Sequence, residues 1–195
     1  MPRPRSLTTQ QIAAAALAVI DRDGLPALSM RTAAEELGRR PMALYRYVED
    51  REELECLVVD LTLGAALREP AQGPPRARLL ALLAAMREAV AAHPGVLPLA
   101  VRHHGGCLAV MRWREWLLEA LADAGVAGPA RAGALHVLVS YVIGALEVEQ
   151  QGVGEGVGGE AFPLLAEALA QRSAAEPGEA FAGGARAVLD GLGVG

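Results

Sequence analysis

Lysine is absent from this chain of 195 residues, so all 18 of its Lys or Arg positions are arginines. Aromatic residues make up only 4% of the sequence, whereas hydrophobic residues make up 52%. A core must therefore be built mainly from Ala, Leu and Val, and Ala and Leu favour helices. The two cysteines, Cys56 and Cys107, are too few and too isolated for a disulfide framework. The length allows one domain or two small ones.

Motifs of catalysis are also missing. The sequence has no GxSxG, HExxH or P-loop motif, and its glycine-rich stretch at 152–160 lacks the Lys-Ser/Thr ending of a phosphate loop. The N-terminus has no apolar signal-peptide core. The most apolar long stretch, Ala132–Val148, contains His136 and Ser140 and falls short of the ~20 apolar residues that span a bilayer. We therefore expect a cytoplasmic protein that is neither an enzyme nor bound to a membrane.

Charge is distributed unevenly along the chain, although the net charge is −5. Residues 1–47 carry seven Arg and four acidic residues, an excess of +3, while residues 48–195 carry eleven Arg and nineteen acidic residues, an excess of −8. A basic end indicates nucleic acid or a membrane surface as its partner.

Apolar residues recur at helical spacing along nearly the whole chain, and no strand pattern stands out. Thr8 and Gln11 match a capping box at the start of a first helix, which Gly24 ends. Asp50 and Glu53 resemble a second capping box. The sequence predicts an all-α fold, with helices at about 8–23, 29–37, 41–48, 50–68, 76–92, 96–104, 107–124, 130–151, 161–172 and 179–192.

The stretch Leu28–Tyr47 predicts two short helices joined by a tight turn. Ser29 is a good N-cap, Gly38 suits the end of the first helix, and Pro41 suits the first turn of the second. A helix, a Gly-containing turn and a second helix exposing Arg and Tyr is the arrangement of a DNA-binding helix-turn-helix. The alternative is an ordinary helical hairpin, which would make the chain an all-α protein-interaction module without specific DNA binding.

Three features of residues 8–58 resemble the TetR family of bacterial transcriptional regulators: the capped first helix, LSMRTAAEELG, and PMALYRYVEDREEL leading into a further helix. SYVIGALEVEQQG and FAGGARAVLDGL resemble the branch that contains the tetracycline repressor itself. The resemblance implies a helix-turn-helix DNA-binding domain over residues 1–50 and a helical ligand-binding and dimerisation domain over residues 51–195.

The same resemblance implies a set of contacts to double-stranded operator DNA. Ser29 would cap its helix at the DNA backbone, and Tyr45, Tyr47 and Arg51 would bind phosphate. Bases would be read from Arg31 and from the start of the recognition helix, at Arg40, Pro41, Met42 and Ala43. Arg can bond guanine bidentately, whereas Met and Ala offer only apolar contact.

The C-terminal region is implied to form a homodimer, through helices near 130–151 and 179–192, and to bind a small-molecule effector that releases the protein from DNA. His103 and Cys107 have the spacing of two metal ligands on one helix face, but Gly105 and Gly106 lie between them, so we expect neither a metal site nor a cofactor. The residues expected to line the effector pocket are Met86, His103, His104, Trp113, Trp116, His136, Tyr141 and Glu147.

Overall fold

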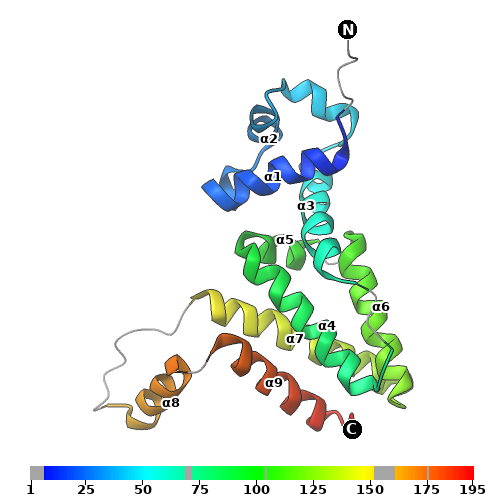
Figure 1. Ribbon diagram of the computed structural model, residues 1–195, viewed down its shortest axis with the longest axis vertical. Coiled ribbons are helices and arrows are strands. Elements are labelled where there is room, and N and C mark those ends of the chain that lie inside the picture. The colour runs from blue at the N-terminus through cyan, green and yellow to red at the C-terminus, as the bar shows by residue number, and fades with distance from the viewer. Residues whose placement is uncertain (1–6, 69–71, 104, 152–160, 175) are drawn as a thin grey trace. The chain divides into compact units, whose positions relative to one another are not determined.

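The computed structural model describes residues 7–68, 72–103, 105–151, 161–174 and 176–195 (Figure 1). These residues form helices joined by turns and include no strand, which confirms the predicted all-α fold. His104, the Arg-containing N-terminal tail at 1–6 and the glycine-rich stretch at 152–160 lie outside the described residues.

The chain divides into two compact units. The first unit consists of Met1–Arg68 and Glu88–Trp113, and the second of Glu69–Arg87 and Arg114–Gly195. Two of the three dividing lines fall within helices, α4 (Pro75–Ala92) and α6 (Leu108–Asp123). The predicted division at residue 50 separates DNA binding from ligand binding and dimerisation, which the compact units do not test, so it stays a prediction.

In the first unit, α1 (Thr9–Asp23) is the helix against which its neighbours pack. Thr8 and Gln11 form the predicted capping box, because each side chain accepts a bond from the backbone N–H of the other. The buried face of α1 contacts the short 3-10 helix η1 (Leu25–Ala27) and two α-helices, α2 (Met30–Glu36) and α3 (Arg51–Ala66). This face consists of Ile12, Ala13, Ala15, Ala16, Val19 and Ile20.

The rest of the first unit packs on α1 and α3. The 3-10 helix η3 (Pro94–Val96) contacts both, and α5 (Leu97–Arg102) packs on α3. A single helix was expected over 96–104. The structure instead has a 3-10 turn followed by a six-residue α-helix, because Pro94 and Pro98 lack the N–H groups that a continuous helix would need.

The second unit contains most of α4 and α6 together with α7 (Gly128–Gln151), α8 (Pro163–Ala174) and α9 (Pro177–Gly191). α7 packs on α9, where the Tyr141 and Phe181 rings lie 5.3 Å apart. Gly184 makes this approach possible, since a Cβ there would lie 2.6 Å from the Tyr141 hydroxyl. The buried stripe of α7 has the four-residue spacing of one helix face: Ala134, Leu138, Val142 and Leu146.

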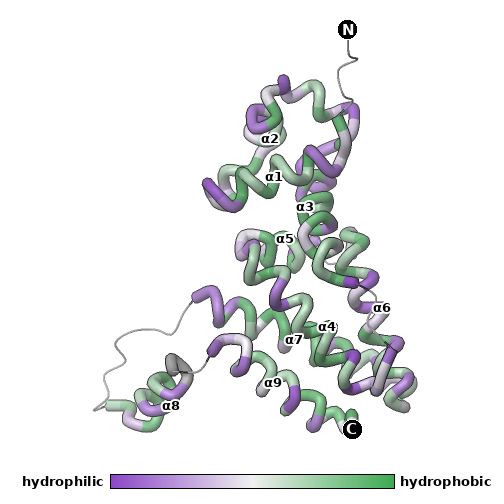
Figure 2. Tube along the Cα trace, in the orientation of Figure 1, coloured by the Kyte–Doolittle hydropathy of each residue, from purple (hydrophilic) through white to green (hydrophobic). Residues whose placement is uncertain are grey.

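The residues of α7 are mostly apolar, and Figure 2 shows a hydrophilic stretch at its C-terminal end. At 24 residues it is longer than the predicted apolar run, and by length and composition it could cross a membrane. Within its most apolar window, 22% of the residues are buried. Core helices of soluble proteins meet the same criterion, so the expected absence of a membrane partner stays a prediction.

Candidate nucleic-acid interface

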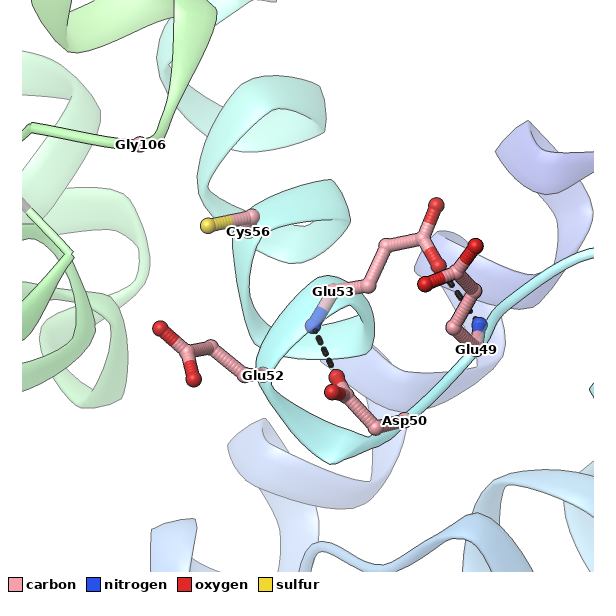
Figure 3. A pocket seen from close by; sticks show the side chains of 6 residues that line it. All are labelled: Glu49, Asp50, Glu52, Glu53, Cys56 and Gly106. Atoms are coloured by element: carbon pink, nitrogen blue, oxygen red, sulfur yellow. Dashed lines mark hydrogen bonds between the residues drawn. The ribbon is translucent and has the colours of Figure 1, made fainter.

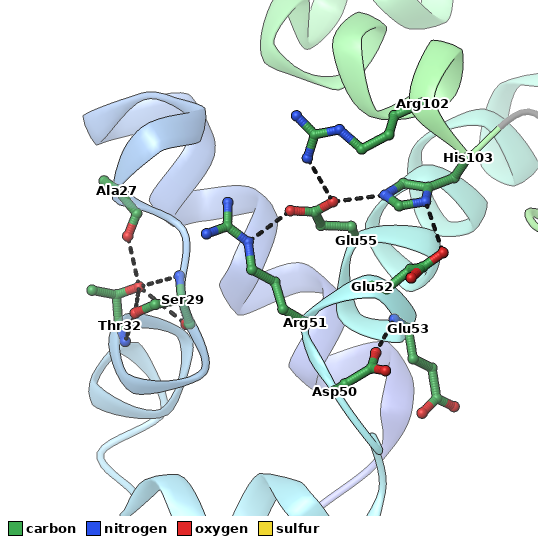
Figure 4. Close-up of polar contacts among 10 residues, drawn as sticks. All are labelled: Ala27, Ser29, Thr32, Asp50, Arg51, Glu52, Glu53, Glu55, Arg102 and His103. Carbon is green, nitrogen blue, oxygen red and sulfur yellow. Dashed lines mark hydrogen bonds and ion pairs between the residues drawn. The ribbon is translucent and has the colours of Figure 1, made fainter.

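The start of α2 is fixed by a reciprocal cap. The Ser29 hydroxyl accepts from the Thr32 backbone N–H at 3.0 Å, and the Thr32 hydroxyl accepts from the Ser29 N–H at 2.9 Å. Thr32 Oγ1 also lies 2.9 Å from the carbonyl oxygen of Ala27, so the cap ties α2 to the turn before it (Figure 4). The predicted role of Ser29 as N-cap is confirmed, and Thr32 supplies the second half of the cap.

The turn after α2 depends on Gly38, whose φ of +62° lies in the left-handed region that favours glycine. The next element, η2 (Pro41–Arg46), is a 3-10 helix of six residues, whereas a longer regular helix over 41–48 was expected. So short a segment gains little from propagating helical bonds, and packing fixes it instead. Leu44 and Val48 are its buried anchors.

Anchoring on one face leaves the other face of η2 in solvent. Met42 is 73% exposed, and Tyr45 and Tyr47 are exposed as well. Arg40 lies exposed just before η2. Arg31, on α2, is exposed too and pairs with Glu35 at 2.8 Å, one turn along the same helix. The residues predicted to contact DNA thus lie mostly on the surface of the first unit, with Ser29, Pro41 and Ala43 half-buried.

Arg51 begins α3, directly after its N-cap Asp50, whose side chain accepts from the Glu53 backbone N–H. The predicted reciprocal bond does not form at Asp50, because the Glu53 carboxylate accepts from the Glu49 N–H instead. Arg51 donates its Nε–H to Glu55 at 2.8 Å. Its side chain is 48% exposed, and its two terminal amino groups take no part in that bond.

Glu55 is the centre of a buried polar cluster (Figure 4). It is only 2% exposed, and its carboxylate contacts His103 Nε2 at 2.7 Å, Arg102 at 3.1 Å and Arg51. Burial by itself would raise the pKa of Glu55, but the hydrogen bonds from His103 and Arg51 and the charges of Arg51 and Arg102 outweigh it and lower that pKa. The cluster therefore holds Arg51 through a carboxylate that stays ionised.

An open hollow of roughly 450 Å³ lies beside the N-terminal half of α3 (Figure 3). Its lining is acidic, apart from one thiol and one glycine, so this hollow is no surface for a phosphate. None of the residues predicted to bind the effector lines it. It is formed by Glu49, Asp50, Glu52, Glu53, Cys56 and Gly106.

The predicted effector residues lie in different surroundings. In the first unit, His103 is buried against Glu55, and Trp113 is buried. In the second unit, Met86 is buried and Trp116 half-buried. On α7, Tyr141 donates its hydroxyl to the Phe181 carbonyl at 2.5 Å, and burial raises its pKa. His136 and Glu147, also on α7, are exposed. Their role in binding an effector stays a prediction.

Three residues of the interface were missed by sequence reasoning. Thr32 and Glu35 act on Ser29 and Arg31 within one helical turn, so their spacing could have revealed them. Glu55 stands four residues after Arg51, a spacing typical of an ion pair, but its burial depends on His103, which is 48 residues away.

Proteins of similar sequence are transcriptional regulators, although no family model matches the chain. An HTH-type transcriptional regulator of Saccharopolyspora erythraea is 33% identical over 146 residues, which are 73% of this chain and 61% of that protein. The HTH-type transcriptional repressor DrrR1 of Streptomyces coeruleorubidus is 30% identical over 151 residues, 74% of this chain and 54% of that protein. The chain thus spans little more than half the length of these curated relatives.

Solved structures agree with this assignment. The TetR family protein ActR of Streptomyces coelicolor, in complex with actinorhodin, is 25% identical with a TM-score of 0.80, covering 98% of this chain and 99% of ActR. BioQ with its natural double-stranded DNA operator is 26% identical with a TM-score of 0.73, covering 97% of this chain and 99% of BioQ. Over nearly its whole length the chain is thus similar in fold and sequence to a TetR-family regulator, and its curated relatives are transcriptional regulators.

Proposed function

We propose that the chain is a cytoplasmic, homodimeric repressor that binds double-stranded operator DNA and is released when a small molecule binds its C-terminal domain. The observation that carries this proposal is the exposed set of arginine and tyrosine side chains between Arg31 and Arg51, held on a well-packed unit. Solvent exposure of so many large cationic and aromatic groups suits a surface that contacts phosphate and base edges. The operator in the BioQ complex supports the same conclusion.

Within this surface, we assign two roles. Tyr45, Tyr47 and Arg51 position the protein on phosphates, while Arg31 and the segment 40–43 read the sequence. Arg51 suits its role because only its Nε is bonded to Glu55, so its terminal amino groups can bond a phosphate while the carboxylate fixes the side chain. Met42, the most exposed of these apolar side chains, can contact a thymine methyl.

A dimer through α7 and α9 accounts for the exposed apolar face of α7. Val137 and Val148 are 42% and 43% exposed, and Gly144 on the same face has open space above its Cα. Small residues let a second helix approach closely, and burying such a face is favourable. A dimer would also place two DNA-binding heads about 34–36 Å apart, the spacing of successive major grooves. Light scattering at micromolar concentration should give twice the mass of the chain, and a monomeric mass would contradict this assembly.

Release by an effector requires that the DNA-binding conformation has the lower affinity for that effector. Actinorhodin in the ActR complex supports a small organic molecule as the effector class. A thermal-shift screen of aromatic compounds tests this assignment. A ligand present at 100 times its Kd stabilises the folded protein by about 2.7 kcal/mol and so raises its unfolding temperature. A hit that stabilises the protein without weakening its DNA binding would contradict the proposed release.

The decisive experiment is a mobility-shift assay on DNA flanking the gene and on a selected library. We expect the protein to bind DNA, and the logarithm of its binding constant should fall linearly with the logarithm of the salt concentration. Arg51→Ala should reduce that slope by about 1, and Tyr45→Phe should weaken binding to all sequences alike. Arg112→Ala, an exposed arginine on α6 in the same unit, is the matched control and should change neither. Failure to bind any DNA at low salt would leave the all-α protein-interaction module as the better description.

A further inference from the structure

We propose that Cys56 and Cys107 form an oxidation site: a dithiol that a neutral hydroperoxide converts into an intramolecular disulfide. The two sulfur atoms lie 3.0 Å apart, although 51 residues separate the cysteines in sequence. Both belong to the first unit, Cys56 on α3 and Cys107 immediately before α6. Neither residue has a part in the proposed DNA contacts.

The geometry is close to that of a bond. A disulfide has an S–S length of about 2.05 Å, so the sulfur atoms need to approach by roughly 1 Å. The Cys107 S–H donates towards Cys56 Sγ, so the thiols already face each other. Gly106, which precedes Cys107, places no side chain between the hollow and Cys56, and a Cβ there would lie 3.7 Å from Cys56 Sγ.

The two thiols differ in access, which assigns their roles. Cys56 is half-buried and lines the acidic hollow, where its sulfur points towards Gly106 (Figure 3). Cys107 is fully buried, and burial followed by the hydrogen bond to Cys56 raises the pKa of its thiol. Cys56 is therefore the thiol that an oxidant meets first, and Cys107 is the resolving thiol.

The hollow also selects the oxidant. Four acidic residues line it, Glu49, Asp50, Glu52 and Glu53, and their negative charge repels anions such as glutathione disulfide. An uncharged hydroperoxide meets no such barrier. Hydrogen peroxide and small alkyl hydroperoxides are small enough to enter a hollow of roughly 450 Å³ and reach Cys56, which lines it.

The reaction balances in two steps. The Cys56 thiolate attacks one oxygen of ROOH, so that an S–O bond forms, the O–O bond breaks, and RO⁻ takes up the proton released from Cys56 to leave as ROH. Cys107 sulfur then attacks Cys56 Sγ. The S–S bond forms, the S–O bond breaks, and the hydroxide leaves as water with the Cys107 proton. Two thiols lose two electrons in total, and the peroxide gains them.

A disulfide here would act on the candidate interface, a consequence that rests on the proposed function. Cys56 directly follows Glu55, whose carboxylate fixes Arg51 at 2.8 Å. Drawing Cys56 roughly 1 Å towards Cys107 displaces this turn of α3. A shift of that size exceeds the range of donor–acceptor distances over which a hydrogen bond such as Arg51–Glu55 forms, about 2.7–3.2 Å. We therefore expect the oxidised protein to bind DNA about tenfold more weakly than the reduced protein.

The site itself is tested without DNA, by treating the full chain with hydrogen peroxide. We expect the intact mass to fall by two hydrogen atoms, a Cys56–Cys107 cross-linked peptide after digestion, and a reducible rise in unfolding temperature of roughly 5–15 °C. In Cys107→Ser, Cys56 should be trapped as a sulfenic acid by dimedone, whereas Cys56→Ser should leave Cys107 unlabelled. Two thiols that persist under excess peroxide, or a disulfide between two chains, would overturn the proposal. Faster oxidation by glutathione disulfide than by peroxide would overturn the choice of oxidant.

The consequence for DNA is tested by comparing reduced and oxidised protein in the mobility-shift assay. Tenfold weaker binding after oxidation, restored by dithiothreitol and absent in peroxide-treated Cys56→Ser, supports it. Equal affinity of the two forms overturns it. If the reduced protein binds no DNA at all, the proposed function fails, and the mass measurement still decides whether the oxidation site exists.

Discussion

In the first unit a carboxylate is enclosed in the core with one imidazole and two guanidinium groups around it. In the second unit, the described ion pairs such as Arg78–Asp123 and Arg87–Glu149 keep their carboxylates at least 28% exposed. Among the described residues, the buried polar side chains are Glu55, Thr62 and His103, and all three belong to the first unit. The pair between Arg87 and Glu149 in the second unit is only partly buried.

The two units therefore differ in what their buried side chains contribute: one fixed arrangement in the first unit, and overall stability in the second. A buried ionic cluster adds little net stability compared with an apolar core, but every partner left alone by a substitution is costly. The first unit therefore has one fixed arrangement in which Arg51 is oriented. The second unit buries apolar faces such as Leu138 and Leu146 of α7, so we expect it to tolerate changes in its ion pairs.

The largest expected effect comes from removing the centre of the cluster. Glu55→Ala leaves the buried His103 without its partner at 2.7 Å and should lower the free energy of unfolding by about 3 kcal/mol. Denaturant unfolding at neutral pH measures this loss. Glu52→Ala removes an exposed carboxylate that lies 3.7 Å from the other ring nitrogen of His103, and this comparison variant should cost less than about 1 kcal/mol because water can replace that contact. Equal costs for the two variants would mean that burial of the carboxylate does not set the cost at Glu55.

Substitution at the α7–α9 contact should have the next largest effect. Gly184→Ala would push a methyl group against the Tyr141 hydroxyl, and overpacking of this kind costs about 2 kcal/mol. Thermal unfolding would report it. At Gly183, a Cβ would meet only the end of Arg186 at 3.9 Å, so Gly183→Ala should be neutral or slightly stabilising. Tyr141→Phe should rescue part of the loss, and no rescue would point to another cause.

The pH dependence of stability should report on the buried carboxylate of the first unit. The pKa of Glu55 is lowered in the folded state, so its contribution is fully present above the unfolded pKa of about 4.3 and is lost as pH falls through the folded value. Wild type and Glu55→Gln should therefore differ most in unfolding free energy at pH 6–7 and converge in acid. A constant difference from pH 7 to pH 3 would contradict the ionised state of Glu55.

Local signals in the sequence predicted local structure well. Thr8 and Ser29 were identifiable as caps because their partners stand three residues away. The helices were also predicted, although α9 starts at Pro177 and not at 179. Its first turn accommodates a proline because the N–H missing there has no helical partner in any case.

Features that depend on distant partners were not predicted. The sequence spacing of Cys56 and Cys107 argued against a disulfide framework, yet the fold brings their sulfur atoms to 3.0 Å. His103 was expected in the effector pocket from the resemblance to the tetracycline-repressor branch, because His103 and His104 lie at a bend comparable to the one that carries a ligand-binding histidine there. Its burial against Glu55 follows from the packing of α5 on α3, which no sequence window of helical length contains. The predicted helix over 41–48 was too long and too regular, because the apolar spacing of the six-residue η2 also fits an α-helix.

The smallest expected effect belongs to the ion pair of the second unit. Arg87 binds Glu149 bidentately, Nε to Oε2 at 3.0 Å and Nη2 to Oε1 at 2.6 Å, and its guanidinium carbon lies 6.0 Å from the centre of the Phe181 ring. Arg87→Ala should cost about 1 kcal/mol in unfolding free energy, because partial exposure lets water solvate the remaining carboxylate. A double-mutant cycle with Glu149→Ala should assign only part of that cost to the pair, since the contact with Phe181 is lost as well. A coupling energy as large as the loss at Glu55 would place a buried ionic cluster in both units and remove the contrast between them.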